Sequence, residues 1–322
     1  SENLFEGLSP WMQKLPGGLI HVNVVGCALF AAISGSSAAT VATVGKMSIP
    51  ELRKRNYPEK ILLGSLAGSG TLGLLIPPSI ILIIYGVTVQ ESIAKLFIAG
   101  ILPGIMIAIL FMFYVIVWSL INKKLMPKSF ENFSLFEKIR RSKKLLPVII
   151  LILAVIGSIY TGIATATEAA SLGVVGALLL SYLQKSLTIQ TFKESLLGAT
   201  KTSCMIAFIL AGSSFLSLAM GFTGLPRNLA IWIEGMELSP YILIIVLMVF
   251  YIILGMFLDG ISAVVLTMAI IEPMIRQAGF DMIWFGIFLV VVVEMAQITP
   301  PVGFNLFVLQ GMANKDMGYI AR

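Results

Sequence analysis

Long apolar stretches separated by short polar segments make up most of the chain. A helix needs about 20 predominantly apolar residues to cross a bilayer, so the longer runs predict membrane helices. The stretch 145–184 is too long for one crossing and is expected to turn at Thr161-Gly162 and the polar segment 165–168. The pattern predicts an all-α polytopic membrane protein, with apolar runs near 19–33, 61–86, 97–121, 145–160, 168–184, 203–220, 240–258, 261–275 and 283–310.

Composition supports a chain that is solvated mainly by lipid. It is 58% hydrophobic and 12% charged, whereas soluble domains carry about 25% charged residues. The net charge of +6 comes from basic residues in the loops between apolar runs, which is typical of membrane orientation and not of nucleic-acid binding. His21 is the sole histidine, which excludes multi-histidine metal sites, and Cys27 and Cys204 lie in apolar runs where a disulfide is not expected.

Lysine and arginine predict the orientation. The segment 122–144 holds eight basic residues against two glutamates, so it is expected to be a cytoplasmic loop. Counting crossings from there places 51–60 and 185–202 on the same side, and 88–96 and 222–238 outside.

The start of the chain does not accommodate two full crossings. Only Ser34 to Pro50 separates the first apolar run from the basic segment 51–60. We therefore expect 22–50 to be a re-entrant helical hairpin that enters and leaves on the cytoplasmic side, with its tip at Ser34–Ser37.

The second half of the sequence repeats the first. Gly35–Ala38 matches Gly260–Ala263, and Ile76–Pro78 matches Thr299–Pro301, in the same order and at nearly the same spacing. The charge pattern gives the copies opposite orientations, and inverted repeats are typical of secondary transporters. The predicted divisions are a partial first repeat at 1–121, with hairpin 22–50 and broken helix 61–86, the cytoplasmic basic loop 122–144, and a second repeat at 145–322, with hairpin 240–275 and broken helix 283–310.

The two repeats are not equally complete. Three apolar runs precede the second hairpin, whereas only 1–18 precedes the first, and the first repeat ends with a run, 97–121, that has no counterpart after residue 310. The natural polypeptide is therefore expected to extend at both ends.

Polar turns at membrane depth indicate function because they are costly there. In Ser34–Thr40, free N–H groups at a new helix start favour a carboxylate, while hydroxyls and carbonyls can bind Na⁺. The alternative is a seam of small residues that lets helices pack closely. Pro77-Pro78 and Pro300-Pro301 free backbone carbonyls that suit a hard cation, with a simple kink as the alternative.

Three single residues carry separate expectations. Asp259 is the one acid in 240–271 and is interpreted as a sodium ligand or proton carrier, or alternatively as a hairpin-tip residue in contact with water. Glu168 opens an apolar run and is expected to cap its helix. His21 is expected to be structural.

Several ordered motifs resemble the large membrane subunit of tripartite ATP-independent periplasmic (TRAP) transporters, within the ion-transporter superfamily of elevator proteins. The resemblance extends over nearly the whole chain, and one departure is Ala166, where the family commonly has proline. The motifs are Leu15–Gly18, Ser34–Thr40, Gly73–Ser79, Pro103-Gly104, Thr161–Ala170, Met256–Gly260 and Thr299–Gly303.

The resemblance implies a bacterial inner-membrane carrier that is not an enzyme. It implies three partners besides the lipid bilayer: a small four-helix membrane subunit, fused or separate, a periplasmic substrate-binding protein, and a small organic anion such as a C4-dicarboxylate or sialic acid. Sodium would be the coupling ion, and the hairpins would slide against a scaffold in an elevator motion.

The resemblance also implies site residues. The first sodium site would use Ser34, Ser37, Gly73, Ile76 and Pro78. The second would use Gly255, Asp259, Ser262, Thr299 and Pro301. Substrate would lie between the hairpin tips, near Ser36, Thr40, Thr71, Gly260 and Asn305.

Two other functions remain open at this point. One is a sodium/carboxylate symporter that works without a binding protein. The other is an intramembrane protease, because Ala32–Gly35 resembles a serine nucleophile motif. The sole histidine precedes Ser34, however, and no base follows it on a later helix.

Overall fold

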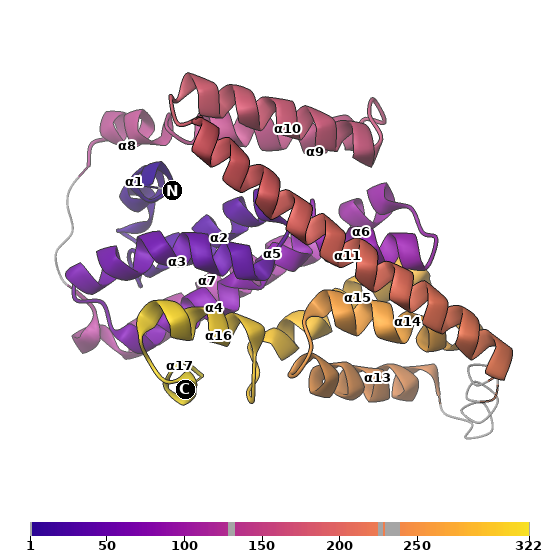
Figure 1. The fold of residues 1–322 in the computed structure, drawn as a ribbon. Coiled ribbons are helices and arrows are strands. Elements are labelled where there is room, and N and C mark those ends of the chain that lie inside the picture. The colour runs from indigo at the N-terminus through magenta and orange to yellow at the C-terminus, as the bar shows by residue number, and fades with distance from the viewer. Residues whose placement is uncertain (1, 128–132, 225–227, 229–238, 322) are drawn as a thin grey trace.

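The computed structural model describes residues 2–127, 133–224, 228 and 239–321, and the regular secondary structure of these residues is helical (Figure 1). The first part of the chain contains α1 (Glu2–Met12), α2 (Ile20–Ser34), α3 (Ser37–Lys54), α4 (Glu59–Gly70), α5 (Leu72–Leu75), α6 (Ile80–Thr88), α7 (Ile93–Ile121), the 3₁₀ turn η1 (Lys123–Leu125) and α8 (Leu135–Ser142). The second part contains α9 (Leu146–Tyr160), α10 (Ala166–Leu183), α11 (Ile189–Thr223), α13 (Pro240–Gly255), α14 (Gly260–Gln277), α15 (Met282–Gln297), α16 (Phe304–Ala313) and α17 (Met317–Ile320).

The described helices fit a polytopic membrane protein. Four are long and apolar enough to cross a bilayer, and the number is six if each of two bent helix pairs counts as one span. One of these pairs joins Glu59–Leu75 to Ile80–Thr88 with a bend of 40°. The predicted all-α membrane fold is therefore confirmed.

The first hairpin consists of α2 and α3. Gly35 ends α2 with a left-handed backbone (φ +59°), a conformation that glycine adopts without steric cost. The Ser36 side chain then accepts a hydrogen bond from the Ala39 N–H and caps α3. Only two residues separate the helices, so the serine-rich segment forms a tight turn between two apolar helices.

The second hairpin consists of α13 and α14. Helix α13 ends at Gly255, and Asp259 caps α14 through hydrogen bonds from the Ile261 and Ser262 N–H groups. The element order of the first hairpin thus recurs, with an aspartate in place of the serine cap. This recurrence lies about 225 residues further along the chain, as the sequence motifs indicate.

A broken helix follows each hairpin. Before Pro77-Pro78, α5 ends at Leu75, and α6 begins at Ile80 with Ser79 as its cap. In the second repeat, α15 ends at Gln297 and α16 begins at Phe304, on either side of Pro300-Pro301. Proline removes a backbone donor and clashes with the preceding turn, which accounts for both interruptions.

The two repeats interlock through the second halves of their broken helices. Helix α6 packs against α14 of the second hairpin, and α16 packs against α3 of the first. Two buried apolar clusters each combine residues of both repeats. One combines α13–α15 with residues such as Tyr85 and Leu96, and the other combines the first hairpin with Leu306 and Leu309.

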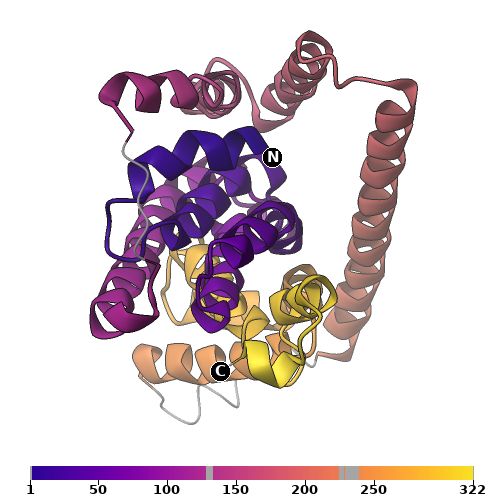
Figure 2. The same cartoon turned by 90° about the vertical axis from the view of Figure 1, so that its left-hand side faces the viewer.

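Helices α9, α10 and α11 lie at the periphery. Figure 2 shows α11 as a long helix along one side of the molecule. It packs against α14, where the Ser213 hydroxyl donates to the Val265 carbonyl at 2.6 Å, but none of its most apolar stretch is buried. Large apolar side chains on these helices are exposed, including Leu172, Val175, Phe208 and Phe215. Such faces suit lipid or another protein.

Two predicted loops contain helices. Segment 185–202 was expected to be a loop, but α11 begins at Ile189, because charged residues report a polar environment and do not prevent a helix from forming. Segment 122–144 includes η1 and α8. A capping box between Ser134 and Glu137 fixes the start of α8. The predicted outer segment 222–238 lies mostly outside the described residues.

Candidate functional site

The first hairpin tip packs directly onto the first broken helix. The Ile80 N–H donates to the Gly35 carbonyl at 3.2 Å. A Cβ atom at Gly35 would lie 2.8 Å from the Pro78 carbonyl oxygen, and one at Gly73 would lie 2.5 Å from the Ser36 carbonyl oxygen. Both glycines therefore permit a backbone approach that no larger residue allows.

Hydroxyl groups line the same tip. The Ser34 and Thr40 hydroxyls share a hydrogen bond of 2.8 Å, and the Thr40 hydroxyl also donates to the Ser36 carbonyl at 2.7 Å. Ser79 donates its hydroxyl to the Leu74 carbonyl at the end of α5. The structure thus gathers serine and threonine oxygens beside the carbonyls that precede and follow Pro77-Pro78.

Most of the predicted first sodium set is assembled in this way. Ser34, Gly73 and Pro78 contact the turn or its neighbours, as described above. Ile76 is half-buried, and its side chain packs towards Gly104 on α7. A role for Ile76 in ion binding would therefore fall to its backbone carbonyl.

Ser37 connects the first hairpin to the second repeat. Its hydroxyl donates to the Gln297 Oε1 at 2.6 Å, and both side chains are buried. The Gln297 Nε2 in turn lies 3.1 Å from the position of a Cβ atom at Gly260. Gln297 thus lies between the two hairpin tips.

The second predicted sodium set is arranged more loosely. Asp259 accepts hydrogen bonds from the Ile261 N–H at 3.1 Å, the Ser262 N–H at 3.2 Å and the Ser262 hydroxyl at 2.5 Å. Thr299 donates to the Met295 carbonyl at 2.6 Å. Among the described residues no hydrogen bond joins Asp259 or Ser262 to Thr299, and Pro301 is exposed.

Gly255 and Gly260 hold the second hairpin against α15. A Cβ atom at Gly255 would lie 2.7 Å from the Ala296 Cβ, and one at Gly260 would lie 2.9 Å from a Val293 methyl group. The second tip therefore rests on the helix just before the Thr299 break, and not on the break itself.

Asn305 and Thr40 are both fully buried among the predicted substrate residues. The Asn305 Nδ2 donates weakly to the Ala67 carbonyl at 3.5 Å, and the Asn305 Oδ1 has no partner among the described residues. Thr71 lies near the same end of α4, with its hydroxyl turned to the Gly68 carbonyl at 2.7 Å. An unpaired buried amide oxygen is costly and favours a ligand that donates to it.

Two polar residues of α15 were not assigned to any predicted site. One is Gln297, whose partner Ser37 is 260 positions away. The other is Glu294, which is 3% exposed, faces the backbone of Leu75 and has an unpartnered Oε1 within the described part of the chain. A lone acid in the apolar run 283–310 was the signal for Glu294.

The remaining single-residue expectations are settled by local contacts. Glu168 and Thr165 form a capping box at the start of α10, as expected for a capping residue. His21 is buried, and its Nε2 lies 2.7 Å from the Pro16 carbonyl, in a structural position. Ser34 bonds to Thr40 and Ser36 and not to a base, so the geometry gives no support to a serine protease.

Comparison with known proteins identifies a family for these features. The family model for the tripartite ATP-independent periplasmic transporter, DctM component, matches residues 2–322. The C4-dicarboxylate TRAP transporter large permease protein DctM of Pseudomonas aeruginosa is 34% identical over the full chain, which spans 75% of that relative.

Other relatives differ in the solute that their names give. The 2,3-diketo-L-gulonate TRAP transporter large permease protein YiaN of Escherichia coli is 32% identical over 92% of this chain and 70% of its own length. The isethionate TRAP transporter permease protein DctMQ of Oleidesulfovibrio alaskensis is 32% identical over the full chain, which spans 51% of that relative.

Proposed function

The chain belongs to the DctM family of TRAP transporter large membrane components, and from this premise we propose that it carries a small organic anion across the bacterial inner membrane, driven by sodium. Membership of a transporter family also bears out the expectation that the chain is not an enzyme. The solutes named for the relatives are C4-dicarboxylate, 2,3-diketo-L-gulonate and isethionate. All are organic anions, and we propose a substrate of this class, with C4-dicarboxylates and sialic acids among the candidates.

One observation carries the proposal: the first hairpin tip and the first broken helix share a close backbone contact between Gly73 and Ser36. Na⁺ prefers hard oxygen ligands, and the proposed first site offers the Ser34 and Ser37 hydroxyls with carbonyls near Gly73, Ile76 and Pro78.

The proposed second site uses Asp259, Ser262 and Thr299 with the backbone near Gly255 and Pro301. These groups lie on separate elements, and ion binding would draw them together. The substrate would occupy the space near Ser36, Thr40, Thr71, Gly260 and Asn305, where helix starts and hydroxyls favour a carboxylate.

The proposal includes two protein partners and a motion. A periplasmic binding protein would deliver the anion, and a small membrane subunit would support this chain. That subunit is separate or fused, and the DctMQ name of one relative favours a fused form in that protein. The two hairpins would move together as an elevator, which the interlocked packing of α6 on α14 and α16 on α3 supports.

Uptake into proteoliposomes tests the proposal. Vesicles containing the complete transporter should accumulate radiolabelled C4-dicarboxylate or sialic acid when sodium is higher outside and the binding protein is present. Omitting the binding protein should abolish accumulation. Accumulation without it would instead support the alternative symporter, which needs no binding protein. Equal accumulation with and without a sodium gradient would refute sodium coupling.

A further inference from the structure

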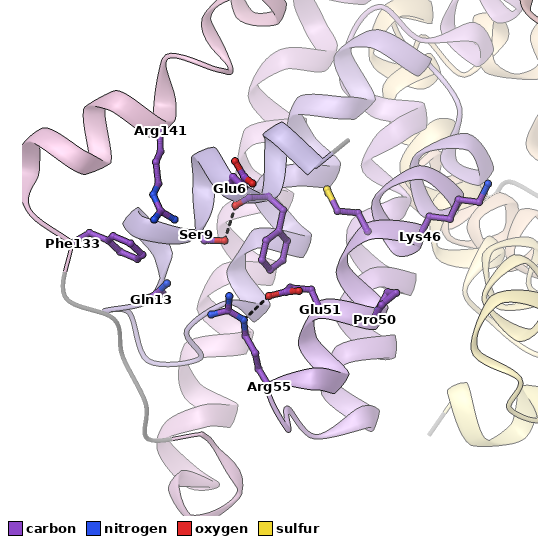
Figure 3. A pocket seen from close by; sticks show the side chains of 11 residues that line it. Glu6, Ser9, Gln13, Lys46, Pro50, Glu51, Arg55, Phe133 and Arg141 are labelled. Atoms are coloured by element: carbon purple, nitrogen blue, oxygen red, sulfur yellow. Dashed lines mark hydrogen bonds and ion pairs between the residues drawn. The ribbon is translucent and has the colours of Figure 1, made fainter. Parts of the chain in front are cut away.

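A polar cavity lies beside the hairpins, away from the proposed transport site. It has a volume of about 760 Å³ and lies between α1, the end of α3 and α8 (Figure 3). This volume is within the roughly 300–1,000 Å³ of small-molecule sites. Its polar and charged lining residues are Glu6, Ser9, Gln13, Lys46, Glu51, Arg55 and Arg141, and Phe133 lies beside them.

Two arginines face the cavity from opposite sides. In Figure 3, Arg141 extends from α8 and Arg55 from the end of α3, toward each other. The Arg55 Nε donates to Glu51 at 2.8 Å, so its terminal nitrogens remain without a partner among the described residues. The Arg141 guanidinium carbon lies 4.2 Å from the centre of the Phe133 ring. The nearby Glu6 carboxylate also lines the cavity and attracts Arg141, but its ion pair is with Lys144. The two arginines therefore offer free donors to an anion.

A buried acceptor completes the lining. Gln13 is 5% exposed, and its Oε1 has no hydrogen-bond partner in the described part of the chain. A ligand that satisfies the whole cavity must accept hydrogen bonds at the arginines and donate one at Gln13. A phosphate diester that carries a hydroxyl group meets both requirements.

The surroundings place the cavity at a membrane surface. Helix α8 exposes Leu135, Phe136 and Ile139, by 72%, 76% and 54%, and carries basic residues beside them. An amphipathic helix of this kind lies in the interface with its apolar side in lipid. Trp11 of α1 donates to the Ser142 hydroxyl at 2.8 Å, and tryptophan is enriched at this depth.

We propose that this cavity binds the headgroup of an anionic phospholipid, with Arg55 and Arg141 on the phosphate and Gln13 accepting from a headgroup hydroxyl. Basic pockets at the cytoplasmic ends of membrane helices bind anionic headgroups in this way. The bound headgroup would connect α8 to the end of α3, the helix that begins at the first hairpin tip. The proposal concerns a separate site and does not rest on sodium-driven transport.

Lipid binding to the complete transporter tests the proposal. The purified protein in neutral detergent is titrated with phosphatidylglycerol or phosphatidylcholine of the same chain length, and native mass spectrometry counts bound lipid. We expect one phosphatidylglycerol to bind at least tenfold more tightly than phosphatidylcholine. Arg141→Gln and Arg55→Gln should each weaken this binding about fivefold.

Arg140→Gln is the matched control, because Arg140 is the neighbour of Arg141 on α8 and does not line the cavity. It should leave phosphatidylglycerol binding unchanged. Equal loss in the Arg140 and Arg141 variants would overturn the proposal in favour of a diffuse surface charge. Tight binding of soluble glycerol phosphate in place of the lipid would also overturn the proposal, because the natural ligand would then be a soluble phosphate and not a lipid headgroup.

Discussion

Asp259 combines a structural contact with a proposed ionic one. Its carboxylate caps α14 through the Ile261 and Ser262 N–H groups. Asparagine caps helices about as well as aspartate but carries no charge. Asp259→Asn should therefore leave thermal stability nearly unchanged. It should raise the sodium concentration needed for half-maximal uptake about tenfold, because the charge of the ligands sets the affinity of a cation site.

Asp259→Ala is the control for the cap. It should destabilise the protein by about 1 kcal/mol in addition to the sodium defect, since the cap is lost as well as the charge. If the asparagine variant shows wild-type sodium dependence, Asp259 is only a helix cap.

Single residues were predicted from sequence where their local segment carried the signal. The turn at Ser34–Ser37 and the cap at Glu168 depend on neighbours within a few positions, and the structure has both. Gln297 was not recognised because its hydrogen-bond partner belongs to the other repeat. No rule of local spacing connects Gln297 to Ser37.

At the scale of elements, the Pro77-Pro78 break is proposed to expose carbonyls for the first ion. Replacing both prolines with alanine restores two backbone donors and favours a continuous helix from α5 into α6. We expect the double variant to insert in the membrane but to lose at least nine-tenths of its uptake rate. The measurement is initial uptake in proteoliposomes at equal protein content.

Pro103→Ala supplies the control for this change. Pro103 lies inside the continuous helix α7, which is a candidate membrane span. This variant should keep most of its uptake, because no helix break depends on Pro103. Similar losses in both variants would mean that proline removal harms the fold in general.

The apolar pattern predicted most element positions but not every boundary. Runs 145–160 and 168–184 correspond closely to α9 and α10. The start of α11 was misjudged, because hydropathy separates lipid from water and does not separate a helix in water from a loop. Helix α8 was missed for the same reason, although Ser134 and Glu137 carry a capping-box signature.

At the scale of the whole molecule, the Ser37–Gln297 hydrogen bond joins the two repeats. Removing either side chain leaves the other polar group buried without its partner, which costs about 1–3 kcal/mol. The losses of unfolding free energy caused by Ser37→Ala and Gln297→Leu should therefore sum to more than the loss in the double variant. The difference is a coupling energy of about 1 kcal/mol. Denaturant titration of the two single variants and the double variant in mixed micelles measures this term.

Strict additivity in that cycle would show that the two residues do not interact. Thr200→Ala offers a comparison, because its hydroxyl bonds within its own helix, α11, to the Leu196 carbonyl, far along the chain from Ser37 and Gln297. The loss of unfolding free energy that this variant causes should add fully to that of Ser37→Ala or Gln297→Leu.

The repeated order of hairpin and broken helix was readable from short motifs, since Pro-Pro and Gly-x-Ser-Ala segments recur with fixed spacing. The interlocking of the repeats was not readable, because the sequence does not indicate that α6 packs on α14 or that α16 packs on α3. These contacts depend on the shapes of apolar surfaces far apart along the chain.

The contact of the first hairpin tip with the broken helix supports the whole proposed mechanism, and the sodium dependence of uptake in a pair of glycine variants tests it most directly. A Cβ atom at Gly73 would lie 2.5 Å from the Ser36 carbonyl oxygen, whereas one at Gly64 would have no heavy atom within 4 Å. Gly64→Ala should therefore match the wild type, with uptake that rises with sodium. Gly73→Ala should need at least tenfold more sodium for the same rate. Superimposable sodium curves for the two variants, or uptake that does not depend on sodium in the wild type, would contradict the account.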